Sequence, residues 1–116
     1  MRFMMLMIPK GYEQAQPGTV PSAEAVAAMM KYNESLQKAG VLLTLDGLHP
    51  PSMGARVSFS NGRPKVTDGP FAEAKEVIAG YFIIEAPSVE AAVAIAAKCP
   101  NAVFGSVEVR EIVPMG

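Results

Sequence analysis

The sequence is poorest in residues that carry cross-links or chemistry: its 116 residues include one cysteine, one histidine and no tryptophan. A single cysteine, Cys99, excludes an internal disulfide and a metal site built from several thiolates. This usage suits a reducing cytoplasm, where we expect the protein to reside. We interpret Cys99 as a small buried residue at a helix end. The alternative, a nucleophilic thiol, would require His49 to lie beside it in the fold.

An excess of charge of either sign is also missing, since ten basic residues stand against eleven acidic ones and the net charge is -1. Such a chain has no cationic surface for a phosphate backbone, so we expect no nucleic-acid binding. No apolar run approaches the roughly 20 residues that cross a bilayer, so we expect no membrane insertion. The apolar N-terminal stretch is followed at once by Pro9 and Lys10 without a cleavage site, and we interpret it as a strand.

What the sequence does contain is a regular succession of apolar segments and breakers, typical of a single domain over residues 1–116. Two segments, residues 2–8 and 79–85, are apolar almost throughout, which predicts strands buried on both faces. Asn61-Gly62 favours the positive φ angles of a tight turn and predicts a hairpin. The predicted strands cover residues 2–8, 41–45, 55–59, 65–67, 79–85 and 106–113.

Two helices are predicted by serine N-caps and apolar stripes. The first runs from Ser22 to about Ala39, with Gly40 as its stop, and the second runs from Ser88 to about Lys98, before Pro100. A short helical turn is also predicted over 71–76, capped by Asp68. The predicted sheet-facing stripes are Val26, Met29, Met30 and Leu36 on the first helix, and Ala92, Ile95, Ala96 and Cys99 on the second.

The order β-α-β, hairpin, β-α-β predicts an α+β fold: a ferredoxin-like split βαβ sheet with an inserted β-hairpin and both helices on one face. Two strands are apolar on both sides, yet the helices can cover only one side of the sheet. A second copy, packed sheet against sheet around a two-fold axis, would cover the other side. The sequence therefore predicts a homodimer.

The stretch Thr67-Asp68-Gly69-Pro70-Phe71-Ala72-Glu73-Ala74-Lys75-Glu76, followed by Gly80-Tyr81-Phe82, resembles the signature of the YCII-related proteins with a DGPF motif. Supporting matches are Gly47-Leu48-His49-Pro50, Ala55-Arg56-Val57 and Glu108-Val109-Arg110, so the resemblance covers nearly the whole chain. It implies a dimeric α+β barrel. The family's function is mostly unassigned: a few members resemble small-molecule enzymes, and others are encoded beside sigma factors.

The wider superfamily is proposed to use a histidine on the first helix and an aspartate at the end of the second. This sequence departs from that pattern, because its first predicted helix has no histidine and its second ends at Lys98-Cys99-Pro100. The superfamily's pair cannot be carried over.

The remaining candidates are polar residues at loops and on strands. His49 is the candidate acid or base, because its unperturbed pKa lies near neutrality, and Asp68 is its candidate orienting carboxylate. Both have ordinary alternatives, His49 as a loop residue and Asp68 as a turn or cap residue. Arg56 and Arg110 are candidates for binding a carboxylate ligand, with Glu108 beside them, or for pairing with Glu108 or Glu85 across strands.

Two functions stay open at this point. One is a small-molecule-binding or regulatory accessory protein, and the alternative is a cofactor-free enzyme that uses His49 and Asp68 on a small polar organic substrate. Neither a metal-ligand spacing nor a phosphate-binding glycine loop is present in the sequence, so no cofactor is expected. Glu73, Lys75 and Glu76 are interpreted as a solvated turn of helix.

Overall fold

A computed structural model describes residues 1–18, 20–71, 76–101 and 105–116. Its centre is an antiparallel sheet of four strands in the order β2-β5-β1-β6. The strands are β1 (Arg2–Pro9), β2 (Leu42–Gly47), β5 (Gly80–Glu85) and β6 (Gly105–Glu111). The two segments predicted to be apolar on both faces, β1 and β5, pair with each other at the middle of this sheet.

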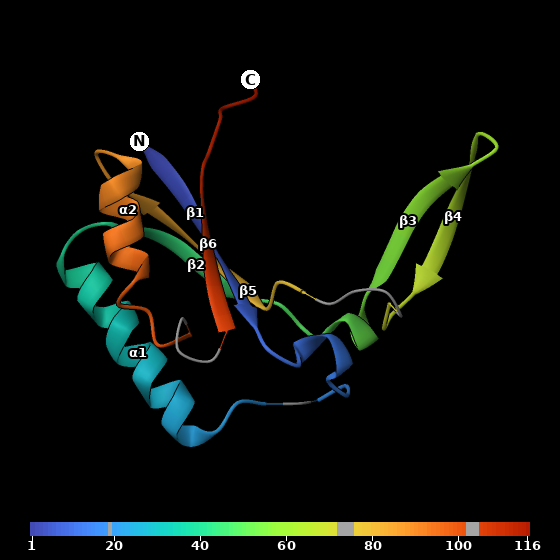
Figure 1. Cartoon of the computed structure of the whole chain (residues 1–116), viewed down its shortest axis with the longest axis horizontal. Coiled ribbons are helices and arrows are strands. Elements are labelled where there is room, and N and C mark those ends of the chain that lie inside the picture. The colour runs from blue at the N-terminus through green and yellow to red at the C-terminus, as the bar shows by residue number, and fades with distance from the viewer. Residues whose placement is uncertain (19, 72–75, 102–104) are drawn as a thin grey trace.

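Both helices, α1 (Ala23–Lys38) and α2 (Val89–Ala96), lie on the same face of the sheet (Figure 1). The predicted caps form, because Ser22 Oγ accepts from the Ala25 amide and Ser88 Oγ accepts from the Ala91 amide. The Tyr32 hydroxyl on α1 donates to the Ile95 carbonyl on α2 at 2.7 Å and ties the two helices together. The predicted α+β fold is confirmed.

Alternation along the strands sorts the side chains into a covered and an open face. Phe3, Met5 and Met7 on β1 are buried beneath the helices, together with Phe82 and Ile84 on β5. On α2 the predicted stripe is confirmed, since Ala92, Ala96 and Cys99 are buried and Ile95 packs against them.

The predicted stripe of α1 is only partly right. Met30 is 59% exposed and Val26 is 40% exposed, whereas Tyr32 and Leu36 are buried and Met29 packs against the core. The reason is geometric: residues three, four and seven apart share a helix face, and neighbours such as Met29 and Met30 do not. The buried stripe is Met29, Tyr32 and Leu36.

The opposite face of the sheet carries the remaining side chains of each strand, because side chains alternate between the two faces. Met4, Leu6 and Ile8 on β1 and Ile83 on β5 are half-buried there, and no helix of the described chain covers them. Glu108 and Arg110 on β6 border them, because Leu6 pairs with Glu108 and Met4 with Arg110. We call this surface the open face.

The hairpin of β3 (Ala55–Ser60) and β4 (Arg63–Asp68) forms a sheet of its own. Its turn is the predicted one, with Asn61 at φ 54° and Gly62 at φ 75°. The hairpin projects away from the body of the molecule (Figure 1), and we call it the arm. Short 3-10 turns, η1 (Tyr12–Gln14) and η2 (Pro51–Met53), occupy segments expected to be loops. The helical turn predicted over 71–76 falls mainly on residues outside the described ranges.

Candidate functional site

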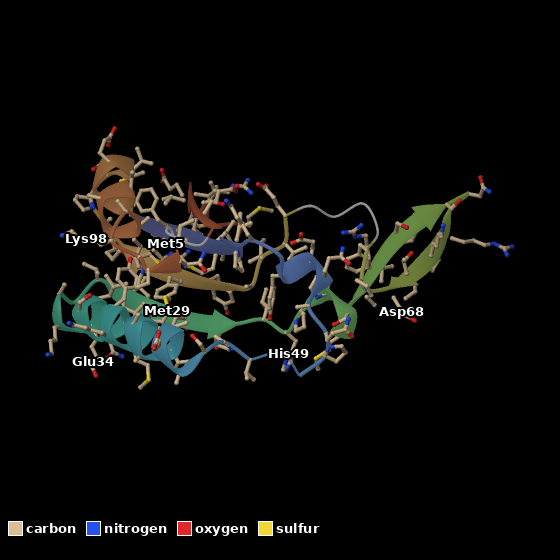
Figure 2. The ribbon with its side chains drawn as sticks, turned by 60° about the horizontal axis from the view of Figure 1, so that its bottom comes forward. Met5, Met29, Glu34, His49, Asp68 and Lys98 are labelled. Atoms are coloured by element: carbon tan, nitrogen blue, oxygen red, sulfur yellow. The ribbon has the colours of Figure 1, made fainter. Side chains whose placement is uncertain are left out.

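The two predicted catalytic residues lie on different segments of the chain. His49 is exposed in the loop after β2, and Asp68 is exposed at the end of β4, at the foot of the arm (Figure 2). Among the described residues no hydrogen bond or ion pair joins them. Their catalytic role stays a prediction, and neither residue lines the cavity described below.

The three predicted ligand-binding residues divide between the arm and the open face. The Arg56 guanidinium lies 4.0 Å from the centre of the Phe71 ring, which is a cation–π contact at the foot of the arm. Arg110 Nε lies 4.0 Å from Glu108 Oε2 on the open face, with both side chains more than half exposed. An exposed pair of this kind contributes little to stability.

A hollow opens at one end of the sheet, between α1, the end of β2 and the start of β5. Its volume is about 510 Å³, which is in the range of small-molecule sites. Apolar side chains make up most of its wall: Met7, Leu45 and Phe82 from the sheet, Met29 from α1, and Val20, Pro21 and Leu48 from the adjoining loops.

Two paired glycines border the cavity, one at the end of β2 and one at the start of β5. Gly47 and Gly80 are paired at the ends of β2 and β5, and both line the hollow. A Cβ atom on Gly80 would lie 2.8 Å from the Asp46 carbonyl oxygen and 3.3 Å from the Gly47 Cα. The two strand ends therefore approach more closely than a side chain at Gly80 would permit.

Few polar groups face this cavity, and most of them are already paired. The Tyr81 hydroxyl donates to Asp46 Oδ2 at 2.7 Å, and the Tyr12 hydroxyl donates to the Leu48 carbonyl at 2.6 Å. Asn101 Nδ2 donates to the Ser106 carbonyl at 3.1 Å. Hydrogen bonding to Asp46, with a smaller contribution from burial, raises the pKa of Tyr81, and burial raises the pKa of Tyr12. Both phenols are neutral at physiological pH.

Asn33, on α1, is the exception. The residue lines the cavity, and its side-chain oxygen is buried and has no hydrogen-bond partner within the described structure. A buried polar atom without a partner costs about 1–3 kcal/mol, so such atoms are uncommon and need an explanation. A ligand that donates a hydrogen bond would satisfy it.

Sequence reasoning missed this cavity. Met29 was interpreted only as core filling, and Asn33 and Asn101 were not singled out, because a neutral amide belongs to no motif. The available signal was the spacing of Met29 and Asn33, four residues apart and hence on one helix face.

None of the residues predicted to be catalytic or ligand-binding lines the cavity. Cys99, in contrast, is 2% exposed, and its Sγ lies 3.7 Å from Met7 Sδ, which supports the interpretation of a buried core residue. Groups of three or more histidine, cysteine or acidic residues able to hold a metal ion are absent from the described part of the chain. Within the same ranges, no helix is long and apolar enough to span a membrane.

Comparison with known proteins adds a relative and a fold neighbour. An uncharacterized protein, R00369, of Rhizobium meliloti (strain 1021) is 38% identical over 88 residues, which are 74% of this chain and 68% of the relative. The solved structure of 5-chloro-2-hydroxyhydroquinone dehydrochlorinase from Burkholderia phenoliruptrix AC1100, in complex with 2,5-dihydroxybenzoquinone, matches with a TM-score of 0.54. That match has 16% sequence identity and covers 97% of this chain and 94% of the neighbour, so it shows a shared fold.

The family assignment rests on the whole length of the sequence. The model of the YCII-related domain matches residues 1–116. The DGPF stretch of the sequence had indicated the same family. The uncharacterized relative shares 38% identity with this chain over 88 residues. The chain belongs to the YCII-related family.

Proposed function

We propose that this protein binds a small, mostly apolar organic molecule in the cavity between α1 and the ends of β2 and β5, as a ligand-binding or regulatory accessory protein. The observation that carries the proposal is the unpaired oxygen of Asn33, a residue that lines a mostly apolar hollow of about 510 Å³ whose other polar side chains are already hydrogen-bonded. Binding sites commonly combine an apolar wall with a few polar groups that fix the ligand's orientation. The ligand expected here is uncharged and carries a hydroxyl or N–H group that donates to Asn33.

The position of the cavity in the fold supports the same proposal. Asn33 and Met29 come from the first helix, and Asn101 lies shortly after the second. These are the two regions from which the superfamily is proposed to draw its histidine and aspartate. In this chain the described residues of both regions at the cavity are uncharged, which favours binding over acid–base chemistry.

The test is a thermal-shift and calorimetry screen of neutral phenols, anilines and quinones. The compound bound by the fold neighbour, 2,5-dihydroxybenzoquinone, is anionic at neutral pH and serves as the charged comparison. A ligand present at 100 times its Kd stabilises the folded protein by about 2.7 kcal/mol. Asn33→Leu keeps the side-chain volume and removes the acceptor, so it is expected to weaken binding roughly tenfold or more. Gln37→Leu, at an exposed position one turn further along α1, is the matched control. Binding that Asn33→Leu leaves unchanged would overturn the assignment of the site.

The enzyme alternative, with His49 and Asp68 as an acid–base pair, has weaker support, because neither residue lines the cavity. The fold neighbour is an enzyme, but a shared fold does not transfer an activity. Turnover of a screened compound that His49→Ala abolishes, while the protein stays folded, would favour this alternative.

We also propose that the protein is a homodimer in which two open faces pack together. Met4, Leu6 and Ile83 provide the apolar part of that surface, and the pairing would be self-complementary about a two-fold axis. Sedimentation equilibrium tests it: a dimer of the 12.3 kDa chain is expected at micromolar concentration, and a stable monomer would contradict it.

A further inference from the structure

The arm has two chemically different faces. Residues directly opposite each other in an antiparallel pair point to the same side, and side chains alternate along each strand. Val57 pairs with Val66 and Phe59 pairs with Pro64, so these four side chains share one face. The other face carries Arg56, Ser58, Ser60, Arg63, Lys65 and Thr67.

The apolar face of the arm is uncovered in the single chain. Val57 is 61% exposed, Phe59 74% and Val66 63%. A two-stranded hairpin is marginal by itself in water and needs a further strand or a packing partner. An arm whose one side is mostly apolar, with Asp68 at its foot, therefore indicates a contact with a surface outside the single chain.

The foot of the arm is fixed, so the arm has a definite direction. The Gly69 amide donates to the Gly54 carbonyl at 2.9 Å. A Cβ on Gly69 would overlap the Pro51 carbonyl oxygen, so the backbone after β4 packs directly on η2. Arg56 over Phe71 adds a second contact at the same place.

We propose that the apolar face of each arm packs on a second copy of this chain, outside the contact between the two open faces. The proposal rests on the homodimer proposed above and gives it a second contact surface. In Figure 1 the four-stranded sheet stands between the two helices on one side and the arm on the other, so the arm lies on the side from which a second sheet would approach.

The size of the interface favours a second copy over another partner. A stable interface takes about 20–30 residues from each side. The open face offers alternate residues of four short strands, about a dozen positions, which is too few. The arm raises the number to about 18, near the lower end of that range, by adding Ala55, Val57, Phe59, Pro64, Val66 and Asp68. A two-fold axis makes both arms equivalent, so one closed pair would cover both apolar surfaces.

The experiment compares the two faces of the arm within one protein. The double variant Phe59→Ser with Val66→Ser removes the apolar contact at exposed positions, and Arg63→Ser with Lys65→Ser is the control on the other face. Sedimentation equilibrium is expected to show a dimer dissociation constant raised at least tenfold by the first change and less than threefold by the second. Circular dichroism confirms that the body of each variant is folded.

Hydrogen exchange provides a second readout that depends on position. Amides of β3 and β4 are expected to be protected in the wild-type dimer and to lose protection on dilution to monomer. If the wild type is a dimer and the Phe59→Ser, Val66→Ser variant has the same dissociation constant, the arm contact is refuted and the homodimer is retained. A monomeric wild-type protein would refute both the homodimer and the arm contact. The arm contact would also be refuted if the arm variant dimerises like the wild type and the apolar face of the arm binds lipid vesicles.

Discussion

The unpaired oxygen of Asn33 leads to opposite effects on stability and on binding. If that oxygen is retained for a ligand, the protein without ligand carries the cost of leaving it buried without a partner. Removing it should then stabilise the empty protein and weaken the complex. Asn33→Leu is the change that tests both effects at once.

The magnitude follows from the surroundings of the side chain. Leaving a buried acceptor unpaired costs about 1–3 kcal/mol, and the lower half of that range applies because Asn33 as a residue is only half-buried. Replacing asparagine by leucine inside a helix adds about 0.5 kcal/mol from helix propensity alone. The expected gain in the free energy of unfolding is therefore about 1.5–2.5 kcal/mol, or roughly 6–10 °C in Tm for a domain of this size.

Urea denaturation of the wild type, Asn33→Leu and Gln37→Leu measures the gain. Gln37→Leu should change the free energy of unfolding by no more than about 0.5 kcal/mol, because that position is exposed and the two residues have similar helix propensities. An Asn33→Leu gain no larger than the propensity effect, together with unchanged ligand affinity, would refute the reasoning.

Two further predictions concern the foot of the arm and the contact between the helices. Gly69→Ala should destabilise the protein by about 2 kcal/mol or more in urea denaturation, or displace the arm, because its Cβ would meet the Pro51 carbonyl. Gly47→Ala is the control for glycine entropy and is expected to cost less, because its Cβ would lie 4.0 Å from the Ala79 carbonyl oxygen, an ordinary contact. A Gly69→Ala protein as stable as wild type, with unchanged exchange in the arm, would argue against the close packing. Burial, and secondarily the nearby Cys99, raises the pKa of Tyr32, so the stability due to its neutral hydroxyl is fully present below the unfolded pKa of 10.0 and is lost as the pH rises through the higher folded value. Tyr32→Phe should therefore be less stable than wild type near pH 7 by about 1 kcal/mol, because the hydrogen bond to the Ile95 carbonyl is lost. Above pH 10 the variant should lose less stability than wild type as the pH rises. Parallel curves of the free energy of unfolding against alkaline pH for the two proteins would contradict this.

The elements of the fold were predictable because they follow from local patterns. The apolar runs of β1 and β5, the serine caps of α1 and α2 and the Asn61-Gly62 turn each act within a few residues. The stripe of α1 was only partly predicted, because the sequence does not show how a helix is rotated about its axis. Met30 turned to solvent and Tyr32 turned inward.

The arm and the cavity depend on tertiary placement, and local patterns do not contain that information. The alternation in β3 and β4 predicts a hairpin, but it does not say whether a third strand or a helix covers it. The cavity joins Asn33, Gly80 and Asn101, which are far apart in the sequence and come together only when α1 packs on the sheet. His49 and Asp68 were chosen for their chemistry, and the fold leaves both outside this hollow.

The most direct test of the central claim is an NMR titration that shows where a small ligand binds. Amide and side-chain resonances of the labelled protein would be followed as a neutral phenol or quinone from the screen is added. The proposed function predicts shifts that cluster at Asn33, Gly47, Gly80 and Asn101, with the Asn33 side-chain amide among the largest. Shifts that cluster instead at Glu108 and Arg110 on the open face, or around His49 and Asp68, would contradict it.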